Sequence, residues 1–224
     1  MTLSWDLTHV LRDGMPVYPG DPEVTFATTA EIDTDGVAVT ALHLSTHTGT
    51  HLDAPSHSIR GGRTAAEIDL DEVRGPALVL HLEPLAPFAE ITVEVLERAY
   101  GRELPPTLPP IIVLDAGWAQ HYGSARAFEH PALTPAAGEM LVARGMHVLG
   151  VDSLSPDPTS PDGTSFPVHD LILGADGIIV ENLCNLDALP ALVDIEIVPL
   201  PIDADGATVR VTARDGGAQH PRGA

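Results

Sequence analysis

Glycine and proline interrupt this chain so often that long regular elements do not fit into it. The 224 residues include 20 glycines and 21 prolines. They are scattered as breaks between short apolar runs rather than gathered into one linker, and no internal repeat is visible. The longest apolar runs, such as 111–114 and 177–180, are far shorter than a membrane-spanning helix. The chain is therefore expected to form one loop-rich globular domain built from short elements.

Short runs rich in β-branched residues predict seven strands, which together imply a sizeable sheet. Three helices are expected between them. Thr92 and Thr134 are suited to cap the first two, and Gly101 and Gly145 are suited to end them. The mixture predicts an α/β domain. The expected helices cover residues 93–100, 135–144 and 167–174, and the expected strands cover 38–46, 77–82, 111–115, 146–151, 177–181, 196–202 and 207–213.

The chain is strongly acidic. It has 32 Asp and Glu against 11 Lys and Arg, which gives a formal net charge of -21. Such a surface repels phosphate backbones, so we expect no nucleic acid among its partners. We expect no membrane either, because the apolar runs are too short to span one. A hydrophobic content of 44% is too high for a disordered acidic chain.

The single cysteine, Cys184, excludes an internal disulfide framework. The first six residues lack the basic and apolar regions of a signal peptide, so the cytoplasm is the expected compartment. The stretch 214–224 shows no apolar period. We therefore expect a single domain over 1–213, followed by a flexible C-terminal tail over 214–224.

Four of the eleven histidines fall close together, at His43, His47, His51 and His57. Asp53 lies among them, and imidazole with carboxylate suits zinc or manganese. In an extended strand, positions 47 and 51 would lie roughly 13 Å apart, near the limit at which two imidazoles can close on one ion. The chain must bend between them, and Gly49 is the residue able to bend.

Other candidate residues have simpler interpretations. His43 alternates with leucines and is expected to pack or hydrogen-bond beside the site. Trp118 and Phe166 either line the apolar part of a pocket or fill the core. Cys184 is expected to be a buried, inert thiol. Four aspartates in loop-like stretches are predicted to be ordinary turn residues, namely Asp157, Asp162, Asp203 and Asp205.

The segment His47-Thr-Gly-Thr-His51-Leu-Asp53-Ala-Pro-Ser-His57 resembles the signature of the cyclase family, whose best-known members are bacterial kynurenine formamidases. Every position of that motif matches. A second landmark of the family is a histidine followed twelve residues later by a glutamate, and His169 and Glu181 have that spacing. The resemblance implies a swivelling β/β/α domain with a mixed sheet and a few helices, assembled as a homodimer or higher homo-oligomer.

The resemblance also implies a divalent metal cofactor, with zinc as the first choice, manganese as the second, and one or two ions bound. His57 would then be the catalytic proton donor and acceptor rather than a primary ligand. Tyr18 occupies the position of a substrate-contacting tryptophan of the formamidases, which changes the size of that wall and adds a hydroxyl. The implied metal ligands are His47, His51, Asp53, His169 and Glu181.

The activity that the resemblance implies is hydrolysis of an amide of a small aromatic compound. The first candidate is N-formylkynurenine, cleaved to kynurenine and formate in tryptophan catabolism. A metal ion supplies activated water for such a reaction, and His57 is placed to move the proton. Three alternatives stay open: isatin-type lactam hydrolysis, ring closure on a polyketide-like substrate, and a non-catalytic, metal-stabilised binding protein.

Overall fold

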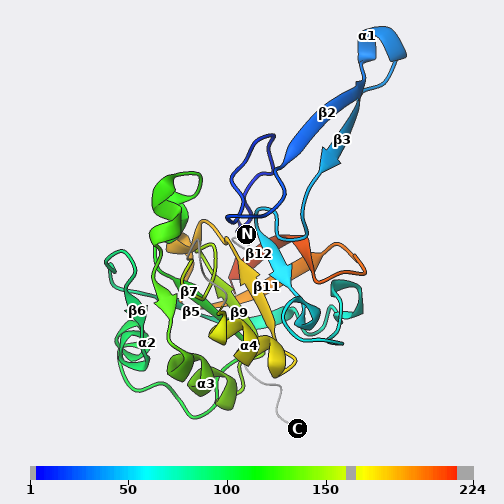
Figure 1. Cartoon of the computed structure of the whole chain (residues 1–224). Helices are drawn as coiled ribbons and strands as arrows, with labels where there is room; N and C mark the ends of the chain where they lie inside the picture. The colour runs from blue at the N-terminus through cyan, green and yellow to red at the C-terminus, as the bar shows by residue number, and fades with distance from the viewer. Residues whose placement is uncertain (1–3, 160–164, 216–224) are drawn as a thin grey trace.

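A closed barrel of seven strands forms the centre of the molecule (Figure 1). The computed structural model describes residues 4–159 and 165–215. Four strands run parallel, namely β5 (Arg74–His81), β7 (Ile111–Asp115), β9 (Val148–Val151) and β10 (Ile178–Glu181). Antiparallel pairs through β4 (His51–Asp53), β12 (Gly206–Asp215) and β11 (Leu192–Pro199) close the circle, and β1 (Ser4–Asp6) extends β12.

The parallel strands are buried on both faces, because their side chains alternate between two cores. Ile111 and Val113 belong to the cluster inside the barrel, whereas Ile112 and Leu114 belong to the cluster beneath the helices. This double burial explains why these strands are read in the sequence as short, nearly continuous apolar runs. The covering helices are α2 (Val93–Tyr100), α3 (Pro135–Ala143) and α4 (Pro167–Gly174).

The helix ends confirm the capping predictions. The Thr92 side chain accepts a hydrogen bond from the backbone N–H of Val95, and Gly101 follows α2 with a φ of 82°. Thr134 caps α3 in the same way, although α3 ends one residue earlier than predicted. Helix α4 has the predicted bounds. The ends of α2 and α3 could be located because their caps depend on residues within one helical turn.

Strands β2 (Thr25–Ala30) and β3 (Val39–His43) form a hairpin arm that projects from the barrel, with α1 (Ile32–Asp35) at its tip (Figure 1). The sequence predicted a strand here as part of the main sheet, but β3 pairs only with β2 among the described residues. Most residues of the arm are exposed. The place of this strand was predicted wrongly, because the alternation of apolar and polar residues is the same in a strand of a two-stranded hairpin and in a strand of a barrel.

Several short elements were not predicted. Strand β4 has three residues, too few to show a period, and β2 is too polar to stand out. Strand β12 continues to Asp215, two residues beyond the predicted domain end, while 216–224 of the predicted tail lie outside the described residues. The other short elements are β6 (Glu90–Ile91), β8 (Ala132–Leu133) and the 3₁₀ helices η1 (Pro55–His57), η2 (Ala65–Glu67), η3 (Trp118–His121), η4 (Ala125–Glu129) and η5 (Leu186–Ala188).

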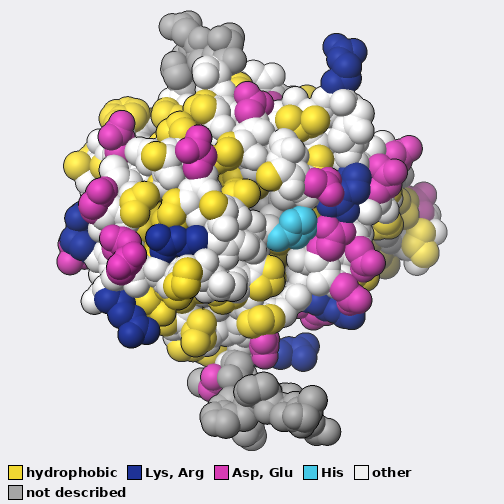
Figure 2. Space-filling view, turned by 90° about the horizontal axis from the view of Figure 1, so that it is seen from below, with side chains coloured by type: hydrophobic (Ala, Val, Ile, Leu, Met, Phe, Trp, Pro, Cys, Tyr) yellow, Lys and Arg dark blue, Asp and Glu magenta, His cyan; other side chains and the backbone are white. Residues whose placement is uncertain are grey.

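Figure 2 shows how charge is spread over the lower face of the molecule. Acidic side chains lie at several places among apolar and basic ones, rather than in a single patch. None of the helices within the described ranges is long and apolar enough to span a membrane.

Candidate metal centre

Two neighbouring barrel strands provide an imidazole and two carboxylates. Strand β4 pairs antiparallel with β10, and the register sets Glu181 opposite His51. Leu52 and Val180 point into the barrel core. Because side chains alternate along a strand, His51, Asp53 and Glu181 project together from the outer face. All three are buried.

The bend at Gly49 adds a second imidazole. Gly49 has a φ of 66°, which confirms the predicted bend, and its carbonyl oxygen accepts a hydrogen bond from Nδ1 of His51 at 2.9 Å. Nε2 of His51 then lies 3.4 Å from Oδ1 of Asp53 and 3.3 Å from Oε2 of Glu181. On the other side of the bend, Nδ1 of His47 lies 2.7 Å from the same Oδ1 of Asp53.

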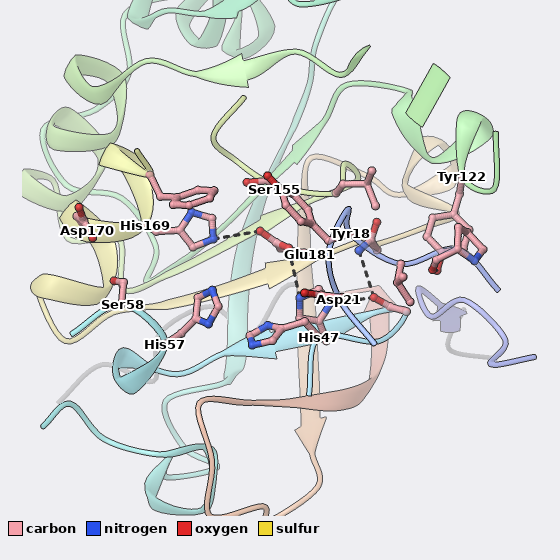
Figure 3. Close-up of a pocket in the computed structure, with 17 residues that line it drawn as sticks. Tyr18, Asp21, His47, His57, Ser58, Tyr122, Ser155, His169, Asp170 and Glu181 are labelled. Atoms are coloured by element: carbon pink, nitrogen blue, oxygen red, sulfur yellow. Dashed lines mark hydrogen bonds and ion pairs between the residues drawn. The ribbon is translucent and has the colours of Figure 1, made fainter. Parts of the chain in front are cut away.

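Helix α4 provides the third imidazole. The carboxylate of Asp157 accepts hydrogen bonds from the backbone N–H groups of Val168 and His169, each at 3.0 Å, and from Nδ1 of His169 at 2.7 Å. This contact turns Nε2 of His169 toward Oδ2 of Asp53, at 3.6 Å, and toward Oε1 of Glu181, at 3.3 Å. Figure 3 shows the ring of His169 pointing at the carboxylate of Glu181.

The five side chains form two triplets that share Asp53. Their ligand atoms lie within 4.8 Å of one another in each triplet, and each triplet could hold one metal ion. The structure thus brings a segment around residue 50 against segments more than a hundred residues later in the chain. The triplets are His47–His51–Asp53 and Asp53–His169–Glu181.

The polar atoms at the centre of this group lack partners. Nε2 of His51, Oδ2 of Asp53 and Oε1 of Glu181 are buried and have no hydrogen-bond partner among the described residues. Leaving such atoms unsatisfied costs about 1–3 kcal/mol each. A divalent cation with nitrogen and oxygen ligands satisfies all three at once, so the residues present fit zinc or manganese.

The outward-facing ring nitrogens point to the same interpretation. Histidines that bind metals almost always donate their other N–H to a carboxylate or a backbone carbonyl, which fixes the ring. Here Nδ1 of His51 donates to the carbonyl oxygen of Gly49, and Nδ1 of His169 donates to the carboxylate of Asp157. Nε2 of His47 lies 2.8 Å from Oδ2 of Asp205. Each imidazole of the two triplets is therefore oriented by a contact to the ring nitrogen that would not bind the ion.

Charge coupling is strong in this group. Burial alone lowers the pKa of His47, but hydrogen bonds to Asp53 and Asp205 outweigh burial and raise that pKa to about 9. Burial is likewise outweighed at His51, where Asp53 and Glu181 raise the pKa to about 10. The imidazoles in turn hold the pKa of Asp53 well below its ordinary value, against the effect of burial. Protons on the rings balance the carboxylates, so binding of a cation must release protons.

A cavity of about 310 Å³ opens beside the triplets (Figure 3). Its lining includes His57, Tyr18 and Phe166, together with four of the five ligand residues, namely His47, His51, His169 and Glu181. Trp118 is instead buried in the core, where its indole N–H lies 3.3 Å from the carbonyl oxygens of residues 126 and 127. The cavity is large enough for a small aromatic molecule.

Two aspartates that sequence analysis read as turn residues contact the site. Asp157 is fully buried and holds His169. Asp205 holds His47, and its Oδ2 also lies 3.2 Å from Nδ1 of His57. The turn interpretation was wrong for both, because each contact depends on a partner distant in the sequence. Their neighbourhood of prolines and glycines gave no signal that could have revealed them.

The other candidate residues have smaller roles. His43 was expected beside the site, but it lies exposed on the hairpin arm. Burial raises the pKa of Cys184 to about 11, as expected for an inert thiol. Asp203 is an exposed loop residue, and Asp162 lies outside the described residues.

Comparison with known proteins places most of this chain in one family. Residues 5–158 match the cyclase family, described as "Putative cyclase". A kynurenine formamidase from Delftia acidovorans (strain DSM 14801 / SPH-1) is 32% identical over 224 residues, covering 94% of this chain and 96% of that protein. The chain belongs to the cyclase family.

Solved structures resemble this cyclase-family chain over almost its whole length. An isatin hydrolase bound to the product analogue thioisatinate superposes with a TM-score of 0.81 at 24% identity, covering 95% of this chain and 92% of that one. Isatin hydrolase A from Labrenzia aggregata, bound to benzyl benzoate, gives a TM-score of 0.79 at 26% identity, covering 96% and 94%. The expected cyclase fold, mixed α/β with few helices, is confirmed.

Proposed function

We propose that this protein is a metal-dependent hydrolase that cleaves an amide of a small aromatic compound. The observation that carries the proposal is the convergence of two ligand triplets on Asp53, beside a cavity that His57 lines. N-formylkynurenine, which gives kynurenine and formate, is the first substrate to test, because a relative 32% identical over nearly the whole chain is named kynurenine formamidase.

The proposed cofactor is one or two divalent ions, with zinc the first choice and manganese the second. His47, His51 and Asp53 would hold one ion, and Asp53, His169 and Glu181 would hold the other. A bound divalent ion lowers the pKa of water and polarises the oxygen of the amide carbonyl. Three protein ligands at an ion leave a coordination position open, which distinguishes a catalytic site from a structural one.

His57 is the proposed proton donor and acceptor. Its ring lines the cavity, with its centroid 4.1 Å from the ring of His47 and 5.7 Å from that of His169. Nδ1 faces Asp205, so Nε2 is the nitrogen available for the reaction. It takes a proton from the attacking water and donates it to the departing nitrogen, which makes the amine a better leaving group.

The cavity walls suit a flat, uncharged ring. Tyr18 is the proposed aromatic contact, and Phe166 and Tyr122 supply further aromatic surface. No Lys or Arg of the described residues lines this cavity, whereas Asp21 and Asp170 do. We therefore expect a neutral or zwitterionic substrate rather than an anion.

Lactam opening is the second candidate activity. Isatin hydrolase A from Labrenzia aggregata is 26% identical to this chain. An isatin-type lactam is a cyclic aromatic amide, so the same water activation and the same proton transfer through His57 would open its ring.

The test is hydrolysis of N-formylkynurenine and isatin by the purified protein loaded with zinc or manganese. We expect turnover of at least one substrate. His57→Ala should lower kcat by about 10²–10⁴ while metal content stays normal. His43→Ala, which removes an exposed histidine of the same stretch, should change neither kcat nor metal content.

If no formamide, anilide or lactam is hydrolysed, the enzyme proposal fails. If His57→Ala turns over as fast as the unaltered protein, His57 has no part in the reaction. A protein that holds its metal but hydrolyses nothing supports the non-catalytic alternative.

We also propose that the protein acts in the cytoplasm as a homodimer or higher homo-oligomer. The hairpin arm leaves Ile32, Val37 and Leu42 exposed by 69%, 58% and 54%. A two-stranded hairpin has little stability in water by itself, so a second copy is the proposed cover. Light scattering coupled to gel filtration tests this, and a monomer at micromolar concentration would contradict it.

A further inference from the structure

Asp205 joins a proposed metal ligand to the proposed proton carrier. It lies in the loop between β11 and β12. Its Oδ2 accepts hydrogen bonds from Nε2 of His47 at 2.8 Å and from Nδ1 of His57 at 3.2 Å. Its Oδ1 accepts one from the hydroxyl of Thr46 at 3.0 Å. Both carboxylate oxygens are thus occupied by groups of the histidine-rich segment.

The loop that carries Asp205 is fixed to that segment. The backbone carbonyl oxygen of Asp205 accepts a hydrogen bond from the N–H of Ala54 at 2.9 Å. Gly206, the next residue, has no room for a side chain, because an added Cβ would lie 2.7 Å from the carbonyl oxygen of Leu52 and 3.0 Å from Cε1 of His47. The carboxylate is therefore held in place by the barrel strands rather than by a free loop.

Hydrogen-bond chemistry then determines which ring nitrogens carry hydrogen. A carboxylate only accepts, so Nδ1 of His57 and Nε2 of His47 must both donate. A neutral imidazole has one N–H. The lone pair of His57 is thereby left on Nε2. Nδ1 of His47 lies 2.7 Å from Oδ1 of Asp53 and must donate to it while no metal is bound; a bound metal ion would displace that proton and take the lone pair of Nδ1.

We propose that Asp205 is a positioning residue that fixes the tautomers of His47 and His57 together. The inference rests on the proposed function, in which His57 moves a proton and His47 binds an ion. An imidazole without this partner exchanges between both tautomers. In the tautomer with hydrogen on Nε2, the lone pair of His57 lies on Nδ1, which faces Asp205, and Nε2 cannot take a proton from water.

The test compares Asp205→Asn with Asp203→Asn. Both remove one carboxylate from the same loop, but Asp203 is exposed. Asp205→Asn should lower kcat and weaken zinc affinity by about 10- to 100-fold each, as loss of such an outer partner does. KM should stay within about three-fold, because the aromatic walls are untouched. Asp203→Asn should keep the kcat, the KM and the zinc affinity of the unaltered protein.

Nitrogen-15 spectra of the histidine rings supply a readout independent of activity. We expect hydrogen on Nδ1 of His57 in the metal-loaded protein, assigned by its loss in His57→Gln, and a mixture of tautomers in Asp205→Asn. Thr46→Val keeps the carboxylate but frees one oxygen, and should give intermediate losses of kcat and zinc affinity.

Hydrogen on Nε2 of His57 in the unaltered protein would overturn the proposal, even if Asp205→Asn failed to fold. Equal kcat and zinc affinity in Asp205→Asn and Asp203→Asn would also overturn it. If the unaltered protein hydrolysed no amide, the proposed function would fail, while the tautomer and zinc measurements would still test Asp205.

Discussion

Gly49 determines whether two imidazoles can reach the same carboxylate. Its φ of 66° turns the chain between His47 and His51, so that both face Asp53. An added Cβ at Gly49 would lie 2.6 Å from a side-chain carbon of Leu11. The bend was predictable because a straight strand spaces the two histidines too widely. The packing against Leu11 was not, since it depends on the fold.

Gly49→Ala should therefore weaken metal binding as well as stability. A left-handed φ costs a side-chain-bearing residue about 1–2 kcal/mol, and the clash with Leu11 adds to it. Gly14→Ala is the matched control, because its φ is 65° but nothing lies within 4 Å of an added Cβ. Denaturant unfolding should show a loss of stability in both variants, and zinc titration should show weaker binding only in Gly49→Ala. Equal zinc affinity in the two would contradict this account.

The five proposed ligands could be located from sequence, because His47, His51 and Asp53 lie unusually close together and the family resemblance adds His169 and Glu181. The residues that hold those ligands could not. Asp157 and Asp205 are ordinary loop aspartates until α4 and the β11–β12 loop bring them to His169 and His47. Local sequence carries no information on such contacts.

Among the elements, α4 is capped by a residue that capping patterns in the local sequence do not reveal. Its bounds were predicted from Pro167 and Gly174, but its cap residue, Phe166, makes no side-chain cap hydrogen bond. Asp157 caps it instead, from ten residues before the helix starts. One carboxylate thus both begins the helix and orients His169, which couples the stability of this element to the site.

A second buried carboxylate caps η3. Asp152 is 4% exposed and accepts hydrogen bonds from the backbone N–H groups of Ala116, Trp118 and Ala119. Burial, with the nearby charge of Asp115, raises its pKa to about 6 despite these donors. The folded protein therefore keeps a proton on Asp152 at a pH where the unfolded chain has lost it.

This raised pKa predicts a pH dependence of stability. Between about pH 4 and 6 the folded state binds more protons at Asp152 than the unfolded chain does. The contribution of Asp152 to the free energy of unfolding therefore falls as pH rises, by roughly 3 kcal/mol in all. Asp152→Asn removes that contribution. Urea unfolding from pH 4 to 7 should show the variant gaining stability relative to the unaltered protein as pH rises. If the free energies of unfolding of the two proteins changed equally with pH over this range, the prediction would be contradicted.

At the scale of the whole molecule, closure of the barrel assembles the site. Strand β4 lies between β10 and β12, so a three-residue segment places His51 and Asp53 against Glu181 on one side and the Asp205 loop on the other. The sequence predicts a mixed α/β domain and six of the seven barrel strands. It did not predict closure, because β4 is too short to show a period.

We infer that barrel closure builds a metal site around the shared carboxylate of Asp53, and the metal content of the protein tests this inference. The purified protein, stripped with a chelator and reloaded with zinc or manganese, should retain one or two ions per chain after dialysis. Asp53→Asn should retain close to none, because both triplets use Asp53, whereas Asp203→Asn should match the unaltered protein. An unaltered protein that retains no divalent metal, or an Asp53→Asn variant that retains as much, would contradict the account.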